Sequence, residues 1–446
     1  MKTLVIRNGN VVGPSAVRSA DVVIAEGSIA EITPNFSGPV DDEIDASGLF
    51  VFPGFIDSHV HFNEPGRTDW EGLESGSRSL AAGGGTVFFD MPLNSDPPVL
   101  DVESLLAKRR IAEEKSATDF ALWGGLCPGH TDAIPAMAEA GAVGFKAFMC
   151  PSGVPEFPHA DAKALRAGMI HAHAVGRPVA VHAEDPEIVA AMPVAGRSLR
   201  DFFESRPKAA EVAAIRLACS LAGETGASLH IVHVTCVEGL REMAQAREAG
   251  VRVTAETCPH YLLFDAERGA EIGARAKCAP PLRSPSDVVA LWGALEEGLV
   301  DIIGSDHSPA PPESKTGDDF FKIWGGISGC QHGMVAFLGE FFCRYPTALP
   351  RAAEWLASRP AERFGLAGKG RLMAGYDADL TLVSFGPPGD PSPPLYRHST
   401  HLYEFHRPRC SVHHVLRRGD FLVRNSMPVH SPTRGRFLRP TPLPIP

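Results

Sequence analysis

Residues 54–61 read GFIDSHVH, an apolar run of strand length that ends in two histidines one residue apart. Seven further runs of this kind follow along the chain, and the stretches between them, such as 212–223 and 237–249, suit helices. The predicted strands are 54–61, 86–91, 119–126, 143–149, 178–184, 228–234, 251–256 and 300–306. Strands that alternate with helices in this way indicate βαβ units and a parallel sheet.

The number of these repeats favours one architecture. Eight units over about 300 residues predict an α/β fold of the (β/α)₈ TIM-barrel type, for which about 250 residues is typical. A doubly wound sheet is the alternative, but no GxGxxG fingerprint opens any unit. We therefore expect a barrel over residues 53–370.

The two flanks of the barrel share a different character, with short strands and turn signals. Residues 3–12 read as a strand that turns at Asn8-Gly9, and 21–32 as a hairpin with its turn at Glu26-Gly27. Near the other end, 379–383 and 412–423 read the same way, with a turn at Arg418-Gly419-Asp420. We predict one small β-sandwich domain built from both termini, residues 1–52 and 371–446.

The end of the chain and the loop before it lack any regular pattern. Residues 386–391 form a Gly/Pro-rich loop, and the last twenty residues are rich in Pro and Arg. We expect this tail to be either loose or packed on a neighbouring subunit.

The bulk composition narrows the class of protein. The chain has 446 residues, 44% hydrophobic and 21% charged, which is close to the average of folded globular proteins. A net charge of −11 leaves no positive field for nucleic acid or anionic lipid, so neither partner is expected. No apolar stretch approaches the ~20 residues needed to cross a bilayer. The nine cysteines are scattered without a CxxC pair, which predicts a reducing, cytoplasmic compartment.

Polar residues of metal-binding type fall late in several predicted strands. His59 and His61, at positions i and i+2 of one strand, present their imidazoles on the same face. The others, each from a different strand, are Lys146, His182, His233 and Asp306. Singly, the histidines can be core residues and Asp306 can cap a helix. Together, at the C-terminal rim where barrel enzymes gather their reactive groups, they predict a metal site.

Lys146 stands inside an apolar strand that should be buried on both faces. A buried ammonium is costly unless it is paired, so a salt bridge is one interpretation. The other is a lysine of lowered pKa that takes up carbon dioxide and forms a carbamate, an anion able to bridge two cations. Four imidazoles, one carboxylate and one carbamate would suit two divalent metal ions, with zinc as the default and iron, cobalt or manganese as alternatives.

These residues stand in segments that resemble the cyclic amidohydrolases of the amidohydrolase superfamily, over nearly the whole chain. The segments are PGFIDSHVHFNEPG, AAGGGTVFFDMP, GFKAFM, VAVHAE, LHIVHVT, ETCPHYL, APPLR, IIGSDHSP and YDADLTLV. The resemblance implies hydrolysis of a cyclic amide by a hydroxide that bridges two metals. It also implies a homotetramer, a carbamylated Lys146, and Asp306 as both metal ligand and general base and acid. The implied metal ligands are His59, His61, Lys146, His182, His233 and Asp306.

Within this family the chain is most similar to the allantoinases, enzymes of purine catabolism that open allantoin to allantoate. Dihydroorotases carry an arginine where this chain has Asn63, and hydantoinases place a tyrosine near Cys150-Pro151-Ser152. The predicted contacts to a cyclic ureide substrate are Asn94, Cys150, Ser152, Cys278 and Gly326. Each can instead serve a turn, a cap, packing or loop geometry.

Other functions remain open from the sequence. Dihydropyrimidinase or hydantoinase and dihydroorotase activities use the same metal chemistry, so the site alone does not choose among them. Some relatives have lost the ligands and act as non-catalytic scaffolds. The complete ligand set argues against that alternative.

Overall fold

The computed structural model describes residues 3–430 and 432–443. All eight barrel strands predicted from the sequence are present, most of them shorter than predicted, down to two residues for the last one, and the third is divided in two. The barrel strands are β6 (Phe55–Val60), β7 (Gly85–Asp90), β8 (Asp119–Leu122), β9 (Gly124–Gly125), β10 (Phe145–Phe148), β11 (Val179–His182), β12 (Leu229–Ile231), β13 (Val253–Thr257) and β14 (Ile302–Ile303).

These strands pair in parallel and close into a ring. β6, β7 and β8 form one sheet, and β9 to β14 form another in sequence order. The two sheets meet around Trp123, because β8 pairs with β7 while β9 pairs with β10. A parallel bridge between Val60 and His307 joins the last strand region to the first, with the His61 amide donating to the His307 carbonyl at 2.7 Å. The barrel prediction is therefore confirmed over the doubly wound alternative.

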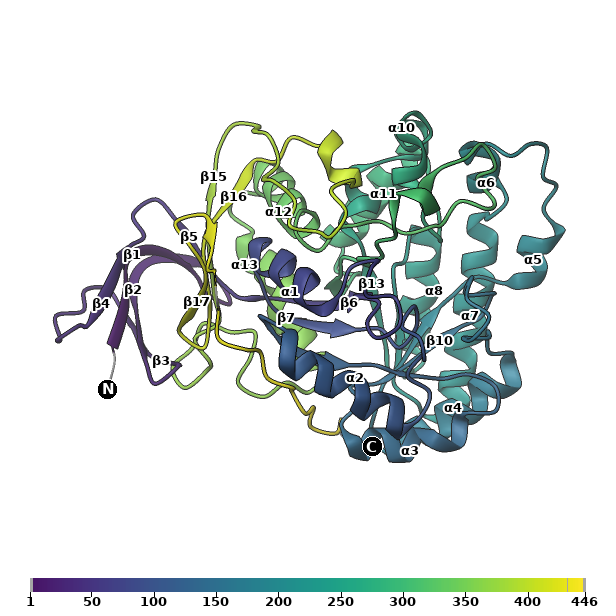
Figure 1. The fold of residues 1–446 in the computed structure, drawn as a ribbon, viewed down its shortest axis with the longest axis horizontal. Coiled ribbons are helices and arrows are strands. Elements are labelled where there is room, and N and C mark those ends of the chain that lie inside the picture. Colours follow the sequence, from purple (N-terminus) through teal and green to yellow (C-terminus); the bar gives the residue numbers. More distant parts are fainter. Residues whose placement is uncertain (1–2, 431, 444–446) are drawn as a thin grey trace.

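Helices surround the barrel (Figure 1). They are α1 (Leu73–Ala82), α2 (Val102–Lys115), α3 (Ile134–Ala140), α4 (Ala162–Ala174), α5 (Pro186–Ala191), α6 (Leu199–Glu204), α7 (Lys208–Thr225), α8 (Val237–Glu248), α9 (Pro259–Leu263), α10 (Ala266–Ile272), α11 (Pro285–Glu296), α12 (Gly333–Arg344), α13 (Leu349–Ala353) and α14 (Arg359–Arg363). Short 3₁₀ or π turns are η1 (Thr131–Ala133), η2 (Gly273–Ala276), η3 (Pro312–Lys315), η4 (Glu354–Ser358) and η5 (Leu402–Phe405). Polar caps start several of them: Asp101 accepts from the Ser104 amide, and Ser284 forms a capping box with Asp287.

The remaining strands form one nine-stranded sheet beside the barrel, at the left of Figure 1. They are β1 (Thr3–Val12), β2 (Val17–Ala25), β3 (Ser28–Thr33), β4 (Asp42–Asp45), β5 (Phe50–Pro53), β15 (Leu380–Phe385), β16 (Cys410–Arg417), β17 (Asp420–Arg424) and β18 (Met427–Pro428). β5 from the N-terminal part pairs with β15 from the C-terminal part. The expected joint contribution of both ends of the chain is confirmed.

One predicted turn in this sheet is wrong. Glu26-Gly27 and Arg418-Gly419 do make hairpin turns, with positive φ at every position. At Asn8-Gly9, however, β1 continues, and the pairing with β2 shifts register between Ile6 and Gly9. Asn8 has φ of 58°, so the left-handed residue that suggested a turn makes a β-bulge instead.

A buried ion network joins the barrel to the β-sheet. Lys369 Nζ lies 2.8 Å from Asp119 Oδ2 of β8 and 2.7 Å from Asp379 Oδ2, the residue before β15. Both carboxylates and the lysine are almost fully buried. Since a buried charge is tolerated only when paired, these three groups fix one relative position of the two parts.

The described part of the C-terminal tail packs on its own barrel, so the expectation of a loose tail is wrong for residues 432–443. Around Phe437 the tail bonds to Phe120 of β8, which donates to the Arg436 carbonyl and accepts from the Leu438 amide. Further on, the Leu443 amide donates to the Gly176 carbonyl. The tail therefore lies across the end of the barrel opposite the strands' carboxyl ends.

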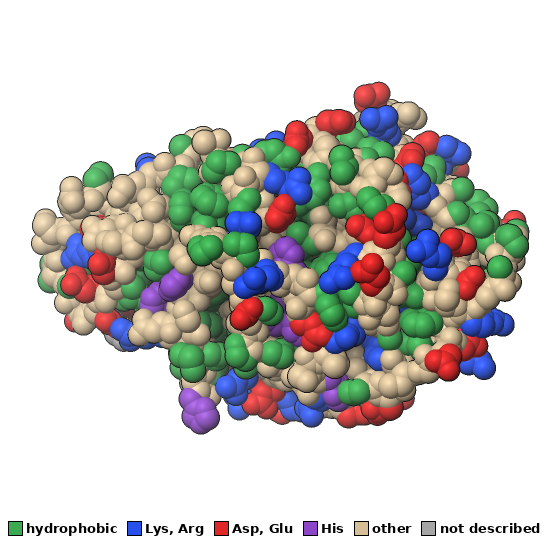
Figure 2. Space-filling view, turned by 90° about the horizontal axis from the view of Figure 1, so that it is seen from above, with side chains coloured by type: hydrophobic (Ala, Val, Ile, Leu, Met, Phe, Trp, Pro, Cys, Tyr) green, Lys and Arg blue, Asp and Glu red, His purple; other side chains and the backbone are tan. Residues whose placement is uncertain are grey.

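Among residues 3–430 and 432–443, no helix has both the length and the apolar character that a bilayer span requires. On the face seen in Figure 2, basic and acidic side chains are interspersed over the barrel. That face offers no continuous basic surface.

Candidate metal centre

Five of the six predicted ligands line one cavity of about 320 Å³ at the carboxyl ends of the barrel strands; they are His59, His61, His182, His233 and Asp306. The sixth, Lys146, is fully buried in β10 beside this cavity, with its Nζ 4.7 Å from the centre of the Phe148 ring that lines it. The predicted convergence of these side chains is therefore present in the structure.

His59 and His61 both lie close to the Asp306 carboxylate. His59 Nε2 lies 3.2 Å and His61 Nε2 lies 3.5 Å from Asp306 Oδ1. Ligand atoms around a tetrahedral ion with bonds of about 2.1 Å are separated by about 3.4 Å. His59, His61 and Asp306 therefore form a candidate metal site.

The other two histidines form a second pair next to the first. His182 Nδ1 lies 3.1 Å from His233 Nε2, the same kind of separation. The ring centres of His59 and His233 are 5.5 Å apart, as are those of His59 and His61. The four imidazoles thus form one continuous row.

The backbone is unusual at two of these positions. His233 has φ of 42° and Asp306 has φ of 46°, in the left-handed region that side-chain-bearing residues rarely adopt. Both lie two or three residues after a short barrel strand, where the chain leaves the sheet. Such conformations concentrate at functional sites, where the surrounding structure holds them.

Two buried carboxylates that sequence reasoning missed orient the histidines. Glu256 Oε1 lies 2.8 Å from His59 Nδ1, and Ser58 Oγ donates to Glu256 Oε2. Glu184 Oε2 lies 2.7 Å from His182 Nε2 and is also paired with Arg206. Carboxylates in this position fix the ring of a metal-binding histidine. Glu184 follows His182 by two residues, which is the one sequence signal that pointed to it.

Burial sets the protonation of the site. It lowers the pKa of His61, His182 and His233, which favours the neutral imidazoles that metals bind. Burial alone would raise the pKa of Asp306, but its interactions with the imidazoles of His59 and His61 outweigh burial and hold that pKa below its usual range. Neutral imidazoles beside an ionised carboxylate form a donor set for divalent cations.

Lys146 has the unpaired state that the carbamate interpretation requires. Within the described chain its Nζ has no hydrogen-bond partner, and no carboxylate lies within ion-pair distance. Burial lowers its pKa to about 8. The salt-bridge alternative is not supported, and an orphaned amine beside four imidazoles fits a bridging carbamate.

The predicted substrate contacts divide into two groups. Asn94, Ser152, Cys278 and Gly326 line the cavity, whereas Cys150 does not and contacts Arg206 at 3.5 Å. The Ser152 hydroxyl donates to the Phe157 carbonyl at 2.7 Å, which braces its own loop.

Several residues that line the cavity were not foreseen from the sequence; they are Phe202, Arg206, Lys277, Ser308, Phe321 and Trp324. They come from loops and from a helix end, where no strand periodicity marks the face of a side chain.

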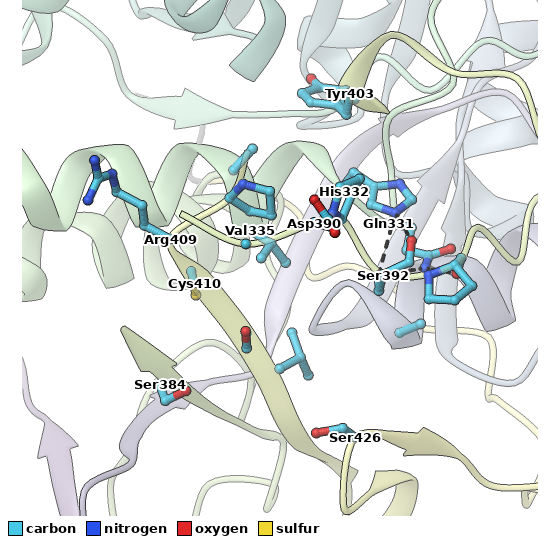
Figure 3. A pocket seen from close by; sticks show the side chains of 18 of the residues that line it. Gln331, His332, Val335, Ser384, Asp390, Ser392, Tyr403, Arg409, Cys410 and Ser426 are labelled. Atoms are coloured by element: carbon cyan, nitrogen blue, oxygen red, sulfur yellow. Dashed lines mark hydrogen bonds between the residues drawn. The ribbon is translucent and has the colours of Figure 1, made fainter. Parts of the chain in front are cut away.

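A larger cavity of about 520 Å³ lies between α12 and the C-terminal strands, but it contains none of the predicted ligands. Figure 3 shows Gln331 and His332 beside Ser392 there. Gln331 Nε2 donates to Ser392 Oγ, and His332 Nε2 lies 2.9 Å from the Ser392 carbonyl. In this larger cavity, Gln331 and His332 anchor the loop that contains Ser392. The candidate site is the smaller cavity, because the predicted ligands line that one.

Known proteins are similar to this chain over almost their entire lengths. A protein named allantoinase from Solibacter usitatus is 46% identical to the chain, over 99% of the chain and 97% of its own length. Another, from Deinococcus radiodurans, is 45% identical, over 99% of both lengths. The L-hydantoinase (dihydropyrimidinase) of Arthrobacter aurescens superimposes with a TM-score of 0.95 at 30% identity, over 98% of this chain and 100% of its own. The dihydropyrimidinase of Brevibacillus agri gives 0.91 at 28% identity, with both chains fully covered. Residues 50–422 match the Amidohydrolase family, and the chain belongs to that family.

Proposed function

We propose that this protein is a metal-dependent cyclic amidohydrolase that opens the hydantoin ring of allantoin to give allantoate. The observation that carries the proposal is the row of four buried imidazoles with an ionised Asp306 and an unpaired Lys146 at one cavity. The identities of 45–46% to proteins named allantoinase, against 28–30% to the hydantoinases, support the choice of substrate.

We assign six ligands to two divalent cations, with zinc as the default and iron, cobalt or manganese as alternatives; the ligands are His59, His61, His182, His233, Asp306 and a carbamylated Lys146. Two such cations, when bound, lower the pKa of a water molecule and polarise a carbonyl group. Glu256 and Glu184 hold His59 and His182 in position for this.

The chain's own catalytic group is Asp306. Its carboxylate, kept ionised beside His59 and His61, accepts a proton from the attacking water. The water oxygen bonds to the amide carbon, the ring C–N bond breaks, and Asp306 returns the proton to the departing nitrogen. Because the same carboxylate accepts and returns the proton, the proton need not leave the site.

Substrate choice lies in the loops around the metals. Asn63, where dihydroorotases carry an arginine, has its side-chain amide 3.4 Å from the Pro309 carbonyl and bears no charge for a substrate carboxylate. The small 150–152 loop leaves room that a tyrosine would fill. Both features favour a ring with a neutral ureido arm over dihydroorotate or dihydrouracil.

The test is a side-by-side measurement of kcat/KM for allantoin, hydantoin, dihydrouracil and dihydroorotate. We expect allantoin to give the highest value. A higher value for dihydrouracil or a substituted hydantoin would reassign the protein to dihydropyrimidinase, and no hydrolysis with metal restored would favour the scaffold alternative.

Three further expectations accompany this proposal. We expect a homotetramer, which light scattering of the purified protein would test, and a cytoplasmic location. We also expect the domain limits of 1–52, 53–370 and 371–446, which limited proteolysis would test.

A further inference from the structure

Lys277 lines the candidate site with an unpaired charge. Four lysines of the described chain are buried. Two of them are neutralised: Lys108 lies 2.7 Å from Asp90, and Lys369 contacts three aspartates. Lys146 and Lys277 have no carboxylate within ion-pair distance among the described residues. Lys146 has its role in the proposed metal centre, which leaves Lys277 to be explained.

The surroundings of Lys277 do not offset the cost of burying it. The residue is 5% exposed, its Nζ donates to the Ile323 carbonyl, and the ammonium lies 4.4 Å from the centre of the Phe202 ring. The nearby Arg206 adds a like charge and is itself paired with Glu184. Asp319 attracts the ammonium, but from beyond ion-pair distance. Burial lowers the pKa of Lys277 to about 8, so the group remains mostly protonated at neutral pH.

The position of Lys277 indicates which part of a ligand it can reach. Phe202 of α6 and the 320–326 loop enclose it, and none of the six proposed metal ligands belongs to those elements. The amide that is cleaved must lie at the imidazole end of the cavity. Lys277 is therefore placed to contact the part of the substrate that lies away from the cleaved amide.

We propose that Lys277 is a specificity-determining residue that donates a hydrogen bond to the ureido carbonyl of the substrate. This inference rests on the proposed function, because allantoin is hydantoin with a ureido group on its ring. A charged donor in a desolvated cavity binds a carbonyl acceptor more strongly than a neutral donor does. Lys277 would then discriminate between rings with and without this arm.

A purely structural role is the competing explanation, and the chain offers a matched control for it. Lys277 Nζ holds the Ile323 carbonyl, and Lys315 Nζ holds the Gly326 carbonyl of the same loop. Lys315 does not line the cavity. If anchoring this loop is all that Lys277 does, Lys277→Met and Lys315→Met should act alike on both substrates.

The experiment compares kcat/KM for allantoin and for hydantoin in the metal-loaded enzyme and its variants. We expect Lys277→Met to lower the allantoin-to-hydantoin ratio at least about 10-fold, mainly through KM, as loss of a charged hydrogen bond predicts. Lys277→Arg should recover part of the ratio, and Lys315→Met should leave it within about 2-fold, whatever happens to the separate rates. Where hydantoin turnover is too slow, its inhibition constant against allantoin replaces kcat/KM.

An unchanged ratio in Lys277→Met, or an equal fall in Lys315→Met, overturns the inference and leaves the proposed function intact. The proposed function is tested by a different measurement, the order of kcat/KM values among substrates of the wild-type enzyme. If wild-type enzyme prefers dihydroorotate, the charge of Lys277 belongs to a carboxylate and the ureido assignment is wrong.

Discussion

Glu256 Oε1 lies 2.8 Å from His59 Nδ1, while the opposite nitrogen of the same ring faces Asp306 at 3.2 Å. The imidazole is thus held between two carboxylates, one in β13 and one shortly after β14. Both Glu256 and His59 are buried, so neither the ring nor the carboxylate has freedom to turn toward solvent.

We expect Glu256→Gln to weaken metal binding about 10- to 100-fold, the usual effect of losing a carboxylate behind a ligating histidine. Competition with a chromogenic chelator measures it. Glu211→Gln is the matched control, since Glu211 is a buried carboxylate paired with Arg283 away from the cavity. Equal metal affinity in Glu256→Gln and wild type would contradict the positioning role.

Replacing Asp306 should separate metal binding from proton transfer. Asp306→Asn keeps the size of the side chain and an oxygen toward His59 and His61, so most of the metal should remain. Turnover should fall at least ~10²-fold, as is typical when a general acid–base group is lost. Metal content and kcat, measured on the same preparation, distinguish loss of metal from loss of proton transfer. A near-normal kcat would remove Asp306 from the proton-transfer step.

The purified protein should hold close to two divalent cations per chain and lose activity with a chelator. Elemental analysis measures the first, and re-addition of metal tests the second. His59→Asn and His182→Asn should each lower the metal content, whereas His332→Gln should not, because His332 is a buried histidine of the other cavity. Full activity with one cation or none would rule out the dinuclear site.

Strand positions and the convergence of the candidate ligands could be predicted because both depend on local patterns. The eight barrel strands are short apolar runs, and the side chains that end them meet at one rim whatever the loops do. His59 and His61 needed only the two-residue period of a strand. For these parts, neighbouring residues in the sequence contain most of the information.

Other features depend on partners far away in the chain. Asn8-Gly9 has the composition of a turn, but pairing of β1 with β2 makes it a bulge. Phe437 packs on Phe120, more than 300 positions away, which no local pattern indicates. In the sequence, nothing distinguishes Lys277 from other polar loop residues. Only the structure shows that it lines the cavity and that its charge has no carboxylate partner among the described residues.

Lys146 provides the sharpest test of the metal centre. We expect Lys146→Ala to abolish activity, because the bridging anion is lost, and short carboxylic acids to restore part of it by occupying the same place. A ¹³C signal of a carbamate should appear in wild-type protein exchanged with labelled bicarbonate and should be absent from Lys146→Ala. Lys277→Met is the control, since Lys277 is the other buried lysine of the described chain without a carboxylate partner, and its loss should leave the signal in place. A free amine at Lys146 in active, metal-loaded enzyme would contradict the carbamate, because an ammonium in that position would repel the cations it is proposed to join.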